Sequence, residues 1–120
     1  MFSLFKKPIK ENINLTEFEP ILSNLINILH KNSDIGQAEF VEEIKYSLLK
    51  NEIENFKKKL ISIDMWGGSG AVWEVGFTNE NKELERIFIL EIIKLLDLIK
   101  KSGIKSKGAQ SRKKILKKFL

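Results

Sequence analysis

The sequence contains no cysteine, a single histidine and only two prolines among its 120 residues. Because cysteine is absent, the chain can form neither a disulfide nor a thiolate metal site, and the lone His30 does not make a metal ligand set. We therefore expect no metal and no cofactor. A chain without disulfides also fits the cytoplasm, which is where we expect the protein to work.

Long apolar runs are missing as well. The longest uninterrupted run covers residues 87–90, far short of the roughly 20 residues that a transmembrane helix needs. The opening residues lack the extended apolar stretch of a secretory signal. With 42% apolar and 31% charged residues, the chain instead has the composition of an ordinary globular protein.

The net charge of +5 is divided unevenly along the chain. Residues 1–99 hold 12 basic and 16 acidic side chains, hence −4, whereas residues 100–120 hold nine basic side chains and no acidic one, hence +9. A mildly acidic body suits a basic partner. The basic end suits an acidic protein, nucleic acid or an anionic membrane surface.

Apolar residues recur at helical spacing in four stretches, which predicts about four helices. They are expected at 17–31, at 37–50, at 52–61 and from Asn81 to near Gly103. The apolar stripe of the last helix is wider than one face. This helix is therefore either central or shared with a second copy of the chain, so that an oligomer remains an option.

One domain is expected over residues 1–102, with an N-terminal arm over residues 1–14. Residues 103–120 are predicted to form a basic C-terminal tail or a short helix outside it. The solvated tail is the favoured alternative, because isolated helices of this length are marginal in water.

The most distinctive stretch lies between the third and fourth predicted helices. Residues 61–77 hold four of the seven glycines and both tryptophans. Gly67, Gly68 and Gly70 permit a tight reversal, and we expect Gly68 to adopt a positive φ. Residues 72–77 then resemble a short strand or one arm of a hairpin. The predicted fold class is therefore α+β, mostly α.

Two kinds of chemistry can be tested on this stretch. A phosphate-binding loop is excluded, because no Gly-Lys-Ser/Thr follows the glycines and Trp73 stands where a dinucleotide fingerprint needs a small residue. Asp64 and Glu74 are its only carboxylates and offer the acid pair of a small hydrolase. No further acid, base or metal cluster accompanies them, so we expect a protein that is not an enzyme.

Residues 65–74, Met-Trp-Gly-Gly-Ser-Gly-Ala-Val-Trp-Glu, are similar to the signature of a small bacterial family of unknown function. Its pattern is Gly-Gly-x-Gly-Ser, two variable residues and Asp, with helices on both sides. Here Ala71 replaces the serine and Glu74 the aspartate. The family resembles immunity proteins encoded beside secreted toxins, which implies a protein that neutralises a toxin.

The sequence therefore favours a non-enzymatic immunity or antitoxin-like protein that binds a cognate bacterial toxin. The predicted partner-binding residues are Trp66, Gly67, Gly68, Gly70, Trp73 and Glu74. The alternative is a nucleic-acid-associated protein that binds through the basic tail, and the third hypothesis is the hydrolase with Asp64 and Glu74. A purely structural role for the turn, pinned to the core by its two indoles, stays open beside all three.

Overall fold

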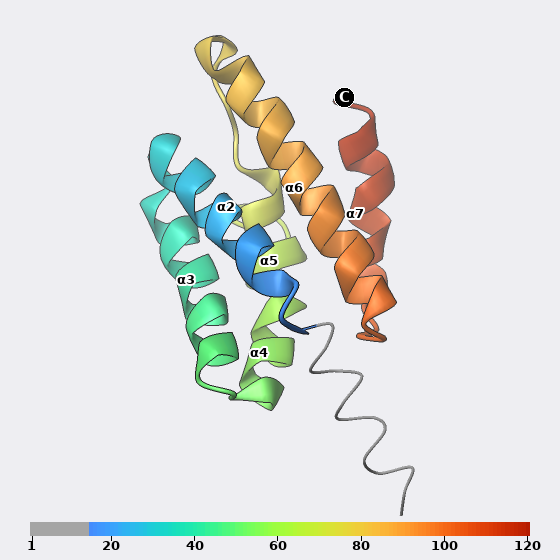
Figure 1. The fold of residues 1–120 in the computed structure, drawn as a ribbon. Coiled ribbons are helices and arrows are strands. Elements are labelled where there is room, and N and C mark those ends of the chain that lie inside the picture. Colours follow the sequence, from blue (N-terminus) through green and yellow to red (C-terminus); the bar gives the residue numbers. More distant parts are fainter. Residues whose placement is uncertain (1–14) are drawn as a thin grey trace, which may run out of the picture.

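The computed structural model describes residues 15–120, so the arm predicted over residues 1–14 lies outside the described part. Element labels follow Figure 1. In chain order the elements are α2 (Phe18–Lys31), α3 (Ile35–Leu49), α4 (Ile53–Leu60), α5 (Ile63–Trp66), the 3-10 turns η1 (Val72–Glu74) and η2 (Asn79–Asn81), α6 (Lys82–Lys101) and α7 (Lys107–Lys117). The four predicted helices correspond to α2, α3, α4 and α6.

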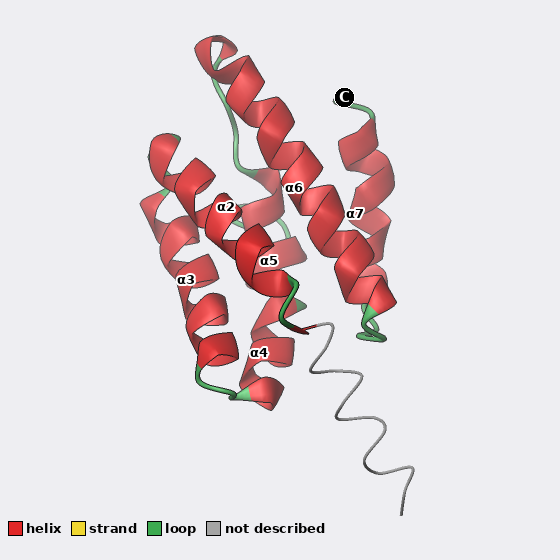
Figure 2. Ribbon diagram, in the orientation of Figure 1, coloured by secondary structure: helices red, strands yellow, loops and turns green. Residues whose placement is uncertain are grey.

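The predicted strand or hairpin over residues 72–77 is wrong, and so is the α+β class: residues 15–120 contain helices and loops and no strand (Figure 2). Val72 is buried and starts η1, in which the Val75 N–H donates to the Val72 carbonyl at 3.4 Å. The extended backbone that follows has no partner strand, and a single strand cannot satisfy its own hydrogen-bonding groups. The described chain is all-α.

The core lies between α2 and α6, with α3 and α4 on the α2 side and α7 on the α6 side (Figure 1). Fully buried leucines of α2 and aliphatic residues of α6 meet here, and the ring of Phe18 contacts that of Phe56 edge-on at 5.2 Å. Most of the wide apolar stripe of α6 is used within the chain, because this helix packs against α2 and α7 at once, whereas Ile87 and Leu90 stay exposed. None of the helices in residues 15–120 is long and apolar enough to span a membrane.

One carboxylate is buried between these two central helices. Glu91 of α6 is 6% exposed, and its two oxygens accept from Asn24 Nδ2 at 3.0 Å and from Lys94 Nζ at 2.9 Å. A buried charge without partners would be strongly destabilising, whereas this one is satisfied on both sides. The Asn24 bond consequently fixes how α2 and α6 sit against each other.

The basic C-terminal stretch forms the helix α7 and not the solvated tail that the sequence favoured. Ser106 is its N-cap and accepts a hydrogen bond from the Ala109 N–H at 3.2 Å, a standard way to start a helix. Ala109 and Leu116 are buried in the same core as α2 and α6. The Gln110 amide also donates to the Leu96 carbonyl of α6 at 2.9 Å.

Candidate functional site

The conformation of the turn requires glycine at two of the three predicted positions, Gly67 and Gly70. The Gly67 N–H closes α5 by donating to the Ile63 carbonyl at 2.8 Å, and a Cβ at Gly67 would lie only 2.6 Å from that oxygen. Gly70 has φ of +88°, in the region that favours glycine. The positive φ expected at Gly68 is wrong, because this residue has ordinary backbone and open space around its Cα.

Both indoles hold the turn closed from within. Trp66 is 3% exposed and donates from Nε1 to the Leu60 carbonyl at 2.8 Å. Trp73 is half-buried and donates from Nε1 to the Gly67 carbonyl at 2.6 Å. Since each indole N–H has a backbone partner, the polar ends are satisfied inside the protein. Trp66 has almost no surface to offer to a partner.

Arg112 of α7 joins the turn to the C-terminal helix. Its Nε donates to the Trp66 carbonyl at 2.9 Å, and its guanidinium lies 4.5 Å from the ring centre of Trp73. A planar guanidinium can stack on the indole and donate a hydrogen bond from its edge, whereas an ammonium has no plane to stack. Nothing in the sequence pairs position 112 with the turn, because Arg112 lies 39 positions after Trp73.

Two side-chain amides tie the same segment to the α2–α3 hairpin. Gln37 Nε2 donates to the Gly70 carbonyl at 3.2 Å, and Asn32 Nδ2 donates to the Gly76 carbonyl at 2.8 Å. The segment is therefore held from α3 on one side and from α7 on the other. These hydrogen bonds explain how the segment between α5 and α6 adopts one defined conformation although most of it is not helical.

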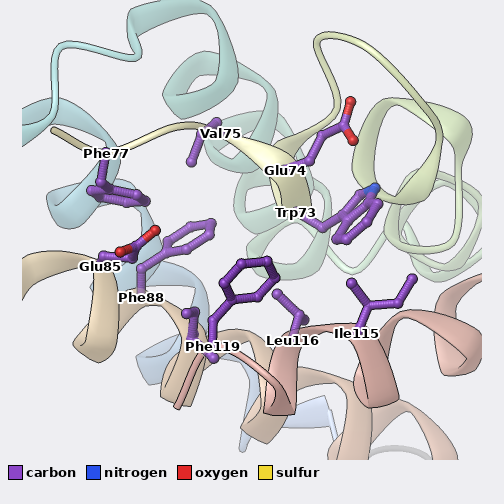
Figure 3. A pocket seen from close by; sticks show the side chains of 10 residues that line it. Trp73, Glu74, Val75, Phe77, Glu85, Phe88, Ile115, Leu116 and Phe119 are labelled. Atoms are coloured by element: carbon purple, nitrogen blue, oxygen red, sulfur yellow. The ribbon is translucent and has the colours of Figure 1, made fainter. Parts of the chain in front are cut away.

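An apolar groove of about 240 Å³ opens between this segment, α6 and the end of α7 (Figure 3). Figure 3 shows the rings of Phe77 and Phe88 side by side, with centres 5.3 Å apart, and Phe119 next to Leu116. The remaining lining residues are Trp73, Glu74, Val75, Glu85, Ile89 and Ile115. Two of the predicted partner-binding residues, Trp73 and Glu74, thus border one surface depression, whereas Trp66 does not.

The carboxylates proposed for a hydrolase are not brought into one site. Glu74 borders the apolar groove, and Asp64 borders a separate depression beside residues of α3, including Glu39 and Glu43. Both side chains are exposed. A pair that acts as acid and base on one bond has to face one substrate. The geometry therefore offers no support for the hydrolase hypothesis.

A second surface, which the sequence did not single out, lies on the outer side of α3 and α4. Tyr46 is 59% exposed and borders two depressions, one toward α2 and one toward α4. We call the second depression the α3 surface; it is lined by Glu39, Glu42, Glu43, Tyr46, Ser47, Glu52 and Lys59. The only available signal was that Tyr46 and Leu49 fall outside the helical period of Ala38, Val41 and Ile44.

No protein-family model matches this chain, and no curated protein or solved structure matches it either. Within residues 15–120, no group of histidine, aspartate and glutamate side chains could hold a metal ion. The geometry offers three features to a partner: the apolar groove, the α3 surface and the basic outer side of α7. Any function has to be inferred from these.

Proposed function

We propose that this protein is a cytoplasmic, non-enzymatic immunity or antitoxin-like protein that binds and neutralises a bacterial toxin through the α3 surface. The observation that carries the proposal is Tyr46, a large aromatic side chain that is 59% exposed within a depression lined by four glutamates. Exposed aromatic residues in concave surroundings are the usual energetic centres of protein interfaces.

Charge supports a basic partner. Four carboxylates and one ammonium line the α3 surface, and that ammonium, Lys59, is already paired with Glu43 at 3.7 Å. Complementary charge accelerates association and disfavours acidic partners. Toxins that act on nucleic acid need a basic cleft, and occluding such a cleft is how we propose that the protein neutralises its target.

The α3 surface is also preorganised. On the opposite side of α3, Ala38, Val41 and Ile44 are completely buried, so the helix that carries Tyr46 is fixed before a partner arrives. A rigid surface loses little conformational entropy on binding. Lys50 lies 4.7 Å from the ring centre of Tyr46 and holds one side of the ring in place.

The glycine-tryptophan turn keeps a supporting part in this proposal. Trp66 is buried and shapes the core, while the exposed Glu74 beside Trp73 borders the apolar groove on the α7 side and is not part of the α3 surface. Gly67, Gly68 and Gly70 contribute through the backbone course that they permit. In this proposal the predicted partner-binding residues support the fold and expose one carboxylate, and the partner contacts the α3 surface instead.

The test is protection of a sensitive bacterial strain in which the toxin encoded beside this gene is co-expressed with the protein. Protection by the wild type should be lost in Tyr46→Ala combined with Glu42→Lys. We expect Tyr46→Ala alone to weaken binding by at least about 30-fold, the effect of an interface hot spot. Circular dichroism of each variant checks that the helices persist.

Glu80→Lys, on the exposed turn η2, is the matched control for the charge reversal and should protect normally. If Glu74→Lys abolishes protection while the α3 variants retain it, the turn and not α3 is the binding site. Absence of a neighbouring toxin that the protein neutralises would overturn the proposed function itself.

A further inference from the structure

We propose that the outer side of α7 binds an anionic lipid surface, such as the inner face of a bacterial membrane. This site is separate from the α3 surface, since α3 and α7 lie on opposite sides of the molecule (Figure 1). The proposal therefore stands independently of any toxin. It rests on the charge of α7, on its exposed apolar side chains and on the way in which it is anchored.

The charge of this region is of one sign. Residues 100–120 hold nine basic side chains and no acidic one. Three of the nine are engaged within the protein: Arg112 at the turn, Lys113, whose Nζ lies 2.6 Å from Asp97, and Lys101, whose Nζ lies 3.9 Å from Glu17. Lys114, Lys117 and Lys118 remain exposed at the end of the helix. They form a local cationic face that anionic headgroups would complement.

Large apolar side chains are exposed among these lysines. Phe119 is 67% exposed, Leu120 is 55% exposed and Ile115 is 37% exposed. Exposure of one such residue is ordinary, but here Ile115 and Phe119 line the rim of the apolar groove beside the lysines, and the exposed Leu120 follows them in sequence. A basic face next to an apolar face is the composition of helices that lie in the membrane interface.

The helix is formed before it meets a surface. Its first turn is capped by Ser106, its inner side buries Ala109 and Leu116, and Arg112 fastens it to the glycine turn. A free peptide of this sequence would have to fold on the membrane, and that ordering opposes binding. Here α7 is already ordered by its packing against α6, so the loss of conformational entropy on binding is small. Three apolar side chains can then contribute measurably to the free energy of binding.

The apolar side chains also decide between a lipid and a nucleic acid. Lysines alone would suit either polyanion. The ring of Phe119 could stack on a base, but Ile115 and Leu120 have no ring, whereas the transfer of all three side chains into the acyl region is favourable. Glu74 and Glu85 border the groove next to Phe119, and their repulsion from anionic headgroups would confine the contact to the α7 side.

Co-sedimentation of the full chain with lipid vesicles tests the proposal. We expect binding to vesicles that contain phosphatidylglycerol, little binding to phosphatidylcholine alone, and weakening at high salt because the exposed charges are screened. The triple variant Lys114→Gln/Lys117→Gln/Lys118→Gln should lower the partition coefficient on the order of 100-fold, at about five-fold per lysine. Phe119→Ser should lower it by roughly 10-fold, as expected for one exposed aromatic side chain that enters the interface.

Matched controls show whether binding depends on the position of the lysines and apolar side chains on α7 or only on the overall composition of the protein. Lys31→Gln/Lys58→Gln/Lys82→Gln removes the same charge from exposed positions on other helices, and Ile63→Ser removes an apolar side chain that is 82% exposed on α5. Both should bind vesicles nearly as the wild type does.

Three results would overturn the proposal. The first is failure of the wild type to bind anionic vesicles, and the second is a control triple variant that loses as much binding as the α7 triple variant. The third is binding to a single-stranded oligonucleotide that depends on the three lysines, without binding to vesicles, which would assign α7 to nucleic acid.

Discussion

Helices α3 and α7 both present a charged outer side to solvent, but they are attached to the protein by different means. α3 buries Ala38, Val41 and Ile44 completely against the core. α7 buries only Ala109 and Leu116 and is held in addition by polar contacts from Arg112 and by others along the helix. Apolar burial scales with area, whereas polar contacts depend on geometry and, when exposed, on salt.

The two surfaces should therefore be disrupted by different substitutions. The α3 surface should persist for as long as the core persists, because its attachment is the core. The α7 side should be separable from the rest by a few local changes, since its attachment is spread over a turn, a carbonyl and an ion pair. Substitutions in the core, in the turn and along α7 test that contrast.

Ile44→Ala should cost about 2–5 kcal/mol of unfolding free energy, the range for truncating a fully buried aliphatic side chain. Ile44 has no exposed surface and faces the core from the middle of α3. Urea unfolding followed by circular dichroism measures the loss, which should affect all helices together. Ile35→Ala, at a half-exposed position of the same helix, should stay within about 0.5 kcal/mol of the wild type.

Leu116→Ala should cost about 2 kcal/mol, the lower end for a buried leucine. Leu116 borders the apolar groove, so the space left behind opens to solvent instead of forming a closed cavity. Hydrogen exchange should show faster exchange in α7 while α3 stays protected. Equal loss of protection in both helices would contradict the contrast, and Ile115→Ala serves as the exposed control.

Gly67→Ala and Gly70→Ala should each cost about 1–2 kcal/mol, the first through a backbone clash and the second through a left-handed conformation. Gly68→Ala is the matched control and should change stability by less than about 0.5 kcal/mol. Thermal unfolding of the three variants measures this order. A large loss of stability in Gly68→Ala would mean that the turn conformation also requires glycine at position 68.

Arg112→Lys should cost about 1 kcal/mol, although the charge is kept, because an ammonium has no planar face to stack on Trp73 while it donates to the Trp66 carbonyl. The indole of Trp73 should then become more accessible to a fluorescence quencher, and Trp66 should not. Lys114→Arg, at an exposed position, is the control. Unchanged quenching in Arg112→Lys would show that the stacking contributes nothing to the position of α7.

Lys113→Gln should have the smallest effect, about 0.2–1 kcal/mol, as for other ion pairs near a protein surface. The distance of 2.6 Å to Asp97 is short, but both side chains are partly exposed. The difference between this variant and the wild type should shrink as salt is added. A cost that persists at high salt would indicate that the contact is better shielded than its exposure suggests.

Helical periodicity predicted α2, α3, α4 and α6 because each buries one consistent stripe. It failed after the turn, where Val72, Val75 and Phe77 are apolar for another reason. Val72 belongs to the core and starts η1, while Val75 and Phe77 pack onto the core from the extended loop that follows. A strand would have required a partner that residues 15–120 do not supply. Local alternation cannot reveal whether a second strand exists.

The sequence did not predict that α7 is a packed helix, nor did it predict the α3 surface, because both depend on contacts between distant parts of the chain. Isolated-helix energetics disfavours α7, but Arg112 meets the turn only after the chain has folded back over 39 residues. Tyr46 was not recognised as a surface residue, since α3 has apolar residues on two faces and its helical periodicity of apolar residues is weak. The glycines and tryptophans were conspicuous in the sequence, and the structure uses most of them inward.

The approach of Gly67 to the Ile63 carbonyl also constrains how such a sequence could diverge. A substitution at position 67 would need a simultaneous shift of α5, so glycine should persist there across long evolutionary distances, while position 70 could also accept asparagine. Positions 68 and 69 are free to drift. An arginine near the C-terminal helix should be gained or lost together with the second tryptophan, and this paired change would identify distant relatives that share little else.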